Sequence, residues 1–316
     1  MKKRFLGNTD IEVSPLCFGS LTMTPFQSNL TVEEGAELLC YGYDKGIKFV
    51  DTAQLYENYQ YIRKALDYIP RQDYIISSKT YAWNEELAEK ALKEAMESLG
   101  TDYIDIFLLH EQESEHTIKG HYEAIEYLIK AKEKGYIRAV GLSTHRVSGV
   151  LGANKYKEIE VLHPILNKKG LGIADGTAED MVEALRQSKA LSKGIYSMKP
   201  LGGGHLIAEI EEAFQFLKKC EFIDSIAVGL QSKEEIDCNL SLLENGIYPE
   251  ELKSTLSHKK RKLIIEDYCI GCRNCVKRCG QKALSLVDNK AVVDSSRCVL
   301  CGYCATVCED FYIKVI

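Results

Sequence analysis

The sequence predicts an α/β protein: a (β/α)8 TIM barrel over residues 1–246, followed by a small α+β domain over residues 267–316. Two observations carry this prediction. Short apolar strands alternate with amphipathic helices along most of the chain, and eight of the 12 cysteines crowd into residues 269–308. Eight strands with interposed helices in this length are typical of a TIM barrel, whose active site lies at the carboxyl ends of the strands.

Composition excludes several classes of protein. The chain has 316 residues, enough for a large hydrophobic core. Its formal net charge of −6 means that it lacks the excess positive charge typical of proteins that bind nucleic acid. No apolar run approaches the ~18 residues that a membrane span requires. The basic start, residues 1–4, is not followed by an apolar stretch long enough for a signal peptide. We therefore expect a soluble, cytoplasmic protein with no membrane partner.

The elements follow one another in a regular order. Residues 4–14 are predicted to form a hairpin that closes the floor of the barrel. The expected strands are 15–20, 47–51, 74–79, 103–110, 137–142, 161–166, 194–198 and 225–228. The clearest helical patterns are 31–43, which opens with the capping box Thr31 and Glu34, then 84–99, 118–131 and 179–191. Residues 247–266 are expected to connect the barrel to the small domain.

Polar residues of complementary type stand at three successive strand ends. Asp51 ends the second strand, with Tyr56 five residues later, Lys79 ends the third and His110 ends the fourth. A tyrosine with a pKa of ~10 is a poor proton donor near neutral pH unless a cation lies beside it, and Lys79 held by Asp51 would supply one. His110 would orient a carbonyl oxygen. Taken singly each residue has a structural explanation, but together they indicate a catalytic group.

These four residues match the Asp, Tyr, Lys and His tetrad of the aldo-keto reductases, and residues 4–245 resemble that family. The resemblance implies a nicotinamide cofactor lying across the top of the barrel and a small-molecule carbonyl substrate. It also implies that Tyr56 is the general acid in carbonyl reduction, or the base in alcohol oxidation.

A glycine run after the seventh strand, residues 202–204, would let backbone amides approach a pyrophosphate closely. By the family resemblance, Ser143 and Asn167 are expected to bind the nicotinamide carboxamide and Met198 to cover the ring. The full set expected to bind the nucleotide is Ser20, Ser143, Asn167, Met198, Lys199, Leu201, Gly203, Gly229, Gln231, Ser232, Glu235 and Asn239.

The same resemblance bears on the choice between NADH and NADPH. Relatives that prefer NADPH carry Arg or Lys at positions matching Gly229, Gln231 or Glu235, where the cation binds the 2′-phosphate. This sequence has no cation there, and Glu235 would repel a dianion. We therefore expect NAD(P)H with a leaning toward NADH.

The cysteine spacing of the tail is the most specific signal in the chain. The motif Cys-x2-Cys-x2-Cys-x3-Cys, called a cysteine comb below, occurs twice. It is similar to the motif of bacterial two-cluster ferredoxins, in which the fourth cysteine is a ligand of the other cluster. The resemblance assigns one [4Fe-4S] cluster to Cys269, Cys272, Cys275 and Cys308, and the second to Cys298, Cys301, Cys304 and Cys279. Zinc is the alternative, but tetrahedral zinc sites use two close pairs and do not need two four-cysteine combs.

Three functions from different classes fit these features. The first is an oxidoreductase whose clusters exchange electrons with a ferredoxin or flavodoxin. The second is an NAD(P)H carbonyl reductase whose clusters only brace the tail, and the third is a redox sensor without turnover. Hydride transfer moves two electrons and each cluster moves one, so coupling them needs a flavin or a substrate radical, and no motif indicates a flavin.

Overall fold

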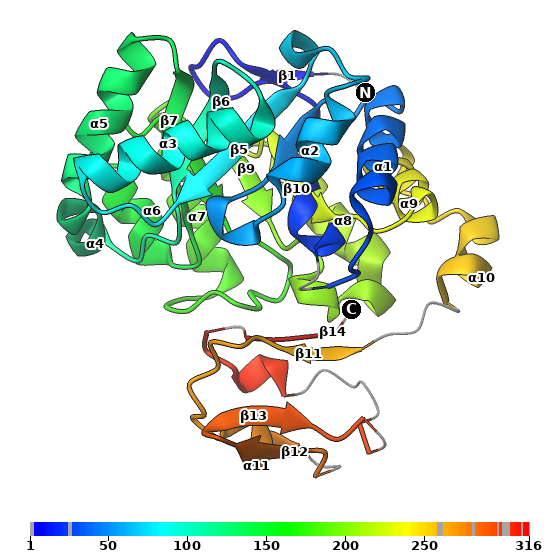
Figure 1. Ribbon diagram of the computed structural model, residues 1–316. Helices are drawn as coiled ribbons and strands as arrows, with labels where there is room; N and C mark the ends of the chain where they lie inside the picture. Colours follow the sequence, from blue (N-terminus) through cyan, green and yellow to red (C-terminus); the bar gives the residue numbers. More distant parts are fainter. Residues whose placement is uncertain are drawn as a thin grey trace.

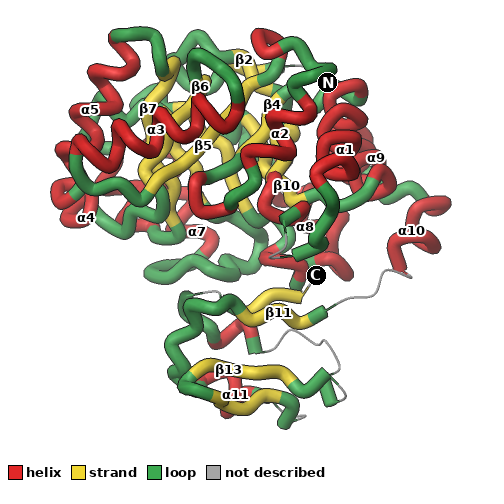
Figure 2. Tube along the Cα trace, viewed as in Figure 1, coloured by secondary structure: helices red, strands yellow, loops and turns green. Residues whose placement is uncertain are grey.

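The structure is a computed structural model that describes residues 3–24, 27–257, 262–279, 282–295, 297–298, 304–310 and 312–315. Parallel strands form a closed barrel in the order β10-β3-β4-β5-β6-β7-β8-β9, which confirms the predicted fold class. Helices surround the barrel, and a small domain with its own short strands lies beyond one end of it (Figure 1, Figure 2).

The barrel strands lie close to their predicted positions. They are β3 (Leu16–Gly19), β4 (Phe49–Asp51), β5 (Ile75–Thr80), β6 (Ile104–Leu109), β7 (Ile137–Thr144), β8 (Val161–Pro164), β9 (Gly194–Met198) and β10 (Ser225–Gly229). The helices around them are α1 (Val32–Asp44), α2 (Tyr59–Ala65), α3 (Glu85–Leu99), α4 (Glu115–Gly120), α5 (Tyr122–Glu133), α6 (Val147–Ala153), α7 (Ala178–Ala190), α8 (Ile210–Lys218), α9 (Lys233–Asn245) and α10 (Glu250–Ser257).

A hairpin closes the amino-terminal end of the barrel, as the sequence predicts. Its strands β1 (Arg4–Phe5) and β2 (Glu12–Val13) pair antiparallel. Three apolar side chains of this region are fully buried and join the cluster that fills the barrel interior: Leu6, Ile11 and Val13. Because this end is plugged, a ligand can enter only at the carboxyl ends of the strands.

Capping decides where α1 begins, and one predicted helix is broken in two. The Thr31 side chain accepts the backbone N–H of Glu34, whose carboxylate accepts the N–H of Thr31, so the predicted capping box is confirmed.

The pattern over residues 118–131 predicts one helix, but two form. His121 lies between them with φ −110° and ψ 16°, outside the helical region, directly after Gly120.

The small domain holds two antiparallel pairs of strands. β11 (Leu263–Ile265) pairs with β14 (Ile313–Val315), and β12 (Leu284–Val287) pairs with β13 (Lys290–Val293). β11 falls in the stretch expected as a connector, so the sheet of this domain begins at Leu263. Short helices α11 (Asn274–Arg278) and η6 (Ala305–Val307) complete the domain as described. The β11–β14 pair lies next to the barrel, and β12 and β13 lie farthest from it (Figure 1).

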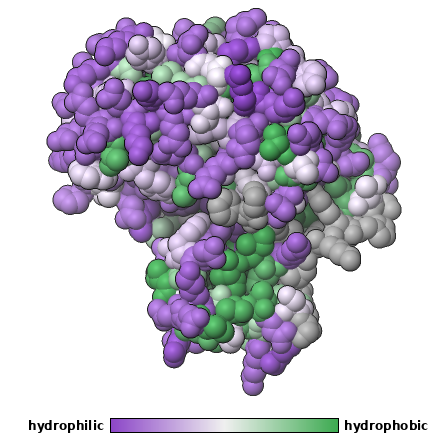
Figure 3. Space-filling model, viewed as in Figure 1, coloured by the Kyte–Doolittle hydropathy of each residue, from purple (hydrophilic) through white to green (hydrophobic). Residues whose placement is uncertain are grey.

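The two regions differ in surface character. Apolar side chains gather on the visible face of the small domain, whereas the barrel surface above it is mostly polar (Figure 3). The exposed apolar residues of the small domain include Tyr268, Ile270, Val287 and Val292. Within the described ranges, no helix combines the length and apolar character that crossing a membrane requires.

Candidate active site

The barrel topology brings the predicted tetrad together at one edge. Asp51 is the last residue of β4, Lys79 is the second-to-last residue of β5, and His110 directly follows β6. Tyr56 ends the short helix η2 (Gln54–Tyr56) that follows β4. Since neighbouring parallel strands finish at the same end of the barrel, these four side chains share its carboxyl-end opening.

Asp51 and Lys79 form a buried ion pair. The Lys79 Nζ donates to Asp51 Oδ2 at 2.7 Å and to the backbone carbonyl of Thr52 at 2.7 Å. The side chains are 1% and 7% exposed for Lys79 and Asp51 respectively. Charge-assisted hydrogen bonds of this length in a dry environment fix the ammonium in one place.

Tyr56 lies beside this pair and keeps its proton. The Lys79 Nζ is 4.8 Å from the centroid of the Tyr56 ring. Burial raises the pKa of Tyr56 well above its usual value, and the carboxylates of Asp51, Glu111 and Glu266 raise it further. The net pKa of Tyr56 is therefore raised in the free protein, so the predicted lowering by Lys79 does not outweigh burial and the nearby carboxylates. Tyr56 is a neutral hydrogen-bond donor here.

His110 faces the same space as a neutral imidazole. Its ring centroid lies 5.8 Å from that of Tyr56, and Tyr81 stacks on it at 4.5 Å. Burial lowers the pKa of His110 well below its usual value, and the ammonium of Lys79 adds to this effect. Among the residues described, none makes a hydrogen bond to the buried Nδ1 of His110.

Two residues outside the predicted tetrad, Tyr196 and His163, lie against Asp51 from the far side of the barrel. The Tyr196 hydroxyl donates to Asp51 Oδ1 at 2.9 Å, and His163 stacks on the Tyr196 ring at 3.9 Å. The Nδ1 of His163 lies 2.7 Å from the Tyr196 carbonyl oxygen. The sequence feature that could have pointed to Tyr196 is a tyrosine, whose hydroxyl needs a hydrogen-bond partner, in the middle of an otherwise buried strand.

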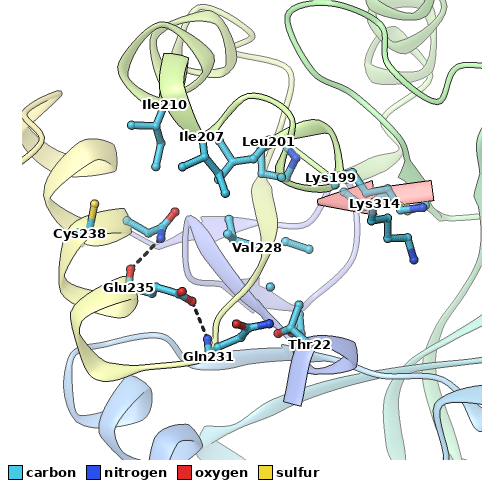
Figure 4. Close-up of a pocket in the computed structure, with 18 of the residues that line it drawn as sticks. Thr22, Lys199, Leu201, Ile207, Ile210, Val228, Gln231, Glu235, Cys238 and Lys314 are labelled. Carbon is cyan, nitrogen blue, oxygen red and sulfur yellow. Dashed lines mark hydrogen bonds between the residues drawn. The ribbon is translucent and has the colours of Figure 1, made fainter. Parts of the chain in front are cut away.

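A cavity of about 770 Å³ runs from the tetrad toward β10 and α9. Asp51 and Tyr56 line it at one end. Most of the residues predicted to bind the nucleotide line it as well: Met198, Lys199, Leu201, Gly203, Gly229, Gln231, Glu235 and Asn239. The structure thus gathers residues from two separate strand ends and one helix around a single volume (Figure 4).

Four other residues of the predicted set do not line this cavity, and each holds nearby backbone. Ser20 donates to the carbonyl at the end of β4 at 2.8 Å, and Ser143 accepts a backbone N–H of the loop after β6 at 2.8 Å. The Asn167 Oδ1 accepts a loop N–H at 2.9 Å. Ser232 is the N-cap of α9. These side chains therefore fix the backbone around the carboxyl-end opening of the barrel and do not face the cavity themselves.

The cavity has features that fit a dinucleotide. Gly202, Gly203 and Gly204 all have positive φ, at 56°, 69° and 104°, a run that only glycine adopts readily. A Cβ at Gly229 would lie 2.1 Å from the Cγ2 of Thr22, so packing against Thr22 requires glycine at this point of the cavity wall. The buried Oδ1 of Asn239 has no hydrogen-bond partner within the described part of the chain, which leaves an acceptor for a ligand.

The predicted 2′-phosphate positions carry no cation. Glu235 accepts the backbone N–H of Gln231 at 2.7 Å, so its carboxylate is held at the cavity wall (Figure 4). That carboxylate would oppose a phosphate placed beside it.

The first cysteine group surrounds a separate cavity of about 60 Å³ in the small domain. Its lining includes all four thiols expected for one cluster: Cys269, Cys272, Cys275 and Cys308. The sulfurs of Cys269 and Cys308 also accept backbone N–H groups, at 3.5 and 3.2 Å. Among the described residues, no three metal-binding side chains lie close enough together to hold a single ion.

The second group is described in part. Cys304 lies in the apolar core of the small domain, Cys279 and Cys298 are partly buried and pack against that core, and Cys301 lies outside the described residues. The Cys279 sulfur accepts a backbone N–H at 3.3 Å. Hydrogen bonds of this kind to cysteine sulfur help to set the reduction potential of a cluster.

The sequence comparisons place these features in a family. The sequence model of the Aldo/keto reductase family matches residues 15–244. The chain belongs to the aldo/keto reductase family. A second model, the 4Fe-4S dicluster domain, matches residues 261–309 of this aldo/keto reductase. The protein is therefore an oxidoreductase of a family that uses NAD(P)H, with an iron-sulfur domain at its carboxyl end.

Individual relatives agree with this assignment. An aldo-keto reductase of Mycolicibacterium paratuberculosis is 28% identical over 244 residues, covering 72% of this chain and 82% of the relative. The uncharacterized oxidoreductase YqkF of Bacillus subtilis is 25% identical over 315 residues, covering 83% and 98%.

Solved structures support the barrel fold. A putative aldo-keto reductase from Pseudomonas aeruginosa matches with a TM-score of 0.67 and 23% identity, over 77% of this chain and 94% of that one. The holo form of an aldo-keto reductase from Bacillus halodurans matches with a TM-score of 0.64 and 24% identity, over 81% and 95%.

We predict that His110 stays uncharged through the neutral pH range. Its pKa is lowered in the folded protein, so its contribution to stability is complete above the unfolded pKa of ~6.5 and declines as the pH falls below it. NMR spectra of histidine-labelled protein, with His110→Gln to assign the signal, should show no titration of this ring near pH 6.5. A His110 midpoint near 6.5 would contradict the proposed neutral imidazole.

Proposed function

We propose that the barrel interconverts a small-molecule carbonyl and its alcohol, with Tyr56 as the proton donor and acceptor. One observation carries this proposal: a protonated tyrosine stands beside a buried Asp51–Lys79 pair and a neutral His110, at the mouth of a cavity large enough for a nucleotide and a substrate. A bound nicotinamide nucleotide supplies the hydride.

The residues divide the acid-base work between them. The Tyr56 hydroxyl donates its proton to the carbonyl oxygen, and the neutral imidazole of His110 donates a hydrogen bond to that same oxygen. As Tyr56 gives up its proton, the ammonium of Lys79 near its ring stabilises the phenolate that forms. Asp51 keeps Lys79 in place during this step. Because its pKa is raised, Tyr56 is already protonated before substrate binds.

For the nucleotide we propose binding along the cavity wall formed by Met198, Leu201, Gly203 and the start of α9. The glycine run offers backbone N–H groups to a pyrophosphate, and the unsatisfied Oδ1 of Asn239 offers an acceptor. Because the carboxylate of Glu235 is held at this wall, where it would repel a 2′-phosphate, NADH is favoured over NADPH.

For the small domain we propose two [4Fe-4S] clusters, held by the cysteine groups assigned above, that exchange electrons with a ferredoxin or flavodoxin. A carrier would meet an exposed surface with apolar residues such as Ile270 and basic residues such as Arg273 and Lys277, and an acidic carrier suits this surface. The position of the β11–β14 sheet beside the barrel opening supports a role beyond bracing the tail (Figure 1).

The cluster assignment predicts about eight irons and eight acid-labile sulfides per chain in protein purified anaerobically. Cys275→Ser should reduce the iron content to about four, because it removes one ligand of one cluster. Cys40→Ser, in the barrel, is the matched control and should leave the content unchanged. A product that holds zinc or only four irons after anaerobic reconstitution would contradict the assignment.

The charge at Glu235 predicts that NADH binds at least as tightly as NADPH. Glu235→Arg should shift the preference toward NADPH, since it replaces a repelling carboxylate with a phosphate ligand. Glu234→Arg, on the same helix but outside the cavity lining, is the control. Fluorescence titration of both nucleotides measures the ratio. A wild-type preference for NADPH beyond about tenfold, or about 1.4 kcal/mol, would show the charge argument to be wrong.

The role of Tyr56 predicts that Tyr56→Phe lowers turnover by about 10²- to 10⁴-fold, the usual contribution of a general acid. Lys79→Met should act similarly and the two losses should not add, because the residues work as a unit. Cluster spectra and nucleotide binding should be unchanged. Tyr68→Phe, at a side chain 74% exposed, is the control. Wild-type turnover by Tyr56→Phe would move the chemistry away from this group.

A further inference from the structure

The iron-sulfur domain contributes a side chain to the barrel cavity. Strand β14 lies against the glycine-rich turn η4 (Gly202–Gly204) of the barrel. Its central residue, Lys314, is only 6% exposed and lines the same cavity as Asp51 and Tyr56. Figure 4 shows Lys314 extending from this strand beside Lys199.

Lys199, which follows β9, supplies a second amine to the same part of the cavity. Its Nζ lies 3.3 Å from the Nε2 of His145. Burial lowers the pKa of Lys199 to about 7, and the ammonium of Lys314 contributes to this shift. Lys314 therefore disfavours the charged form of Lys199 in the same cavity, and an anion bound between the two amines would relieve that repulsion.

The pair lies away from the end where the adenosine phosphate is expected. In Figure 4, Lys199 and Lys314 are at one side of the cavity, and Gln231 and Glu235 are at another. The neighbours of Lys199 come from the strands next to His110: His145 follows β7 and contacts Glu111, which follows β6, at 3.5 Å. The two amines thus lie on the substrate side.

A carboxylate already holds Lys314 in place, and carboxylate charges lie near Lys199. Lys314 donates to Glu266, which precedes the first cysteine comb, and the charges of Glu111 and Glu266 both act on Lys199. Such partners keep two lysines ordered in a buried setting, where each would otherwise carry a large desolvation cost.

We propose that Lys314 and Lys199 together bind a carboxylate of the substrate, so that the carbonyl compound is an oxo acid and the iron-sulfur domain completes its binding site. This inference rests on the proposed function, because it assumes a carbonyl beside Tyr56. Binding the carboxylate at this wall would hold the far end of a short oxo acid while its carbonyl lies between Tyr56 and His110. Lys314, on β14 outside the barrel, would then determine specificity for substrates that carry a carboxylate.

The test uses the full cluster-loaded chain saturated with nicotinamide nucleotide, and calorimetric titration with oxamate, an unreactive analogue of a short oxo acid. Oxamate should bind to the wild type, and the neutral diamide oxamide should not. Lys314→Gln and Lys199→Gln should each weaken oxamate binding by about 10- to 100-fold, the usual effect of losing one charge-assisted hydrogen bond. Lys290→Gln, on the exposed strand β13, is the matched control.

Two further measurements separate charge from folding. Lys314→Arg should restore most of the affinity, because it keeps the charge, and the visible spectrum of the clusters should match the wild type in each variant. Oxamate binding should also weaken as the pH rises through about 7, where Lys199 loses its proton. The groups that face it, Lys314, Glu111, Glu266, Lys79 and His145, set this midpoint.

Three outcomes would overturn the proposal: no oxamate binding by the wild type, equal binding by Lys314→Gln, or weaker nucleotide binding with unchanged oxamate binding. The last result would assign the amines to the pyrophosphate of the nucleotide instead. Failure of the proposed function is a different result, because oxamate binding would still depend on Lys314 while no carbonyl compound turned over.

Discussion

The buried ion pair between Asp51 and Lys79 is the interaction on which the active site depends. Moving two charges out of water costs several kcal/mol per ion, so such a pair persists only where further hydrogen bonds compensate. The Thr52 carbonyl supplies one to Lys79, and the Tyr196 hydroxyl supplies one to Asp51. Strand β9, which carries Tyr196, is therefore as important for the position of the ammonium as β4 and β5 are.

The same burial prepares the two groups that would contact a carbonyl oxygen. It raises the pKa of Tyr56 and lowers the pKa of His110, so both are neutral near pH 7 and both can donate a hydrogen bond. Desolvation alone would make Tyr56 a reluctant acid. In the proposed reaction the fixed cation of Lys79 matters because it stabilises the charged phenolate more than the neutral phenol, so it would help as the proton leaves.

The sequence predicts those parts of the fold that local pattern determines. The alternation of strands and helices and the capping box at Thr31 follow from periodicity and spacing, and Asp51 could be placed because parallel strands end at one edge. The contact between Tyr196 and Asp51 could not be, because it joins residues 145 positions apart. The raised pKa of Tyr56 also depends on burial and on Glu266 of the small domain, which no local pattern reveals.

The arrangement of the small domain links its cysteines to the barrel site. Its core is small and includes Cys275, Cys304 and Ile313, so little apolar surface stabilises it apart from the cysteine ligation. Ile313 precedes Lys314 on β14 and anchors that strand in the same core. Any group that the cysteines bind stabilises the folded domain and with it the position of Lys314 at the cavity. With the proposed clusters and the proposed role of Lys314, cluster assembly and completion of the substrate site would be thermodynamically coupled, even without electron transfer between them.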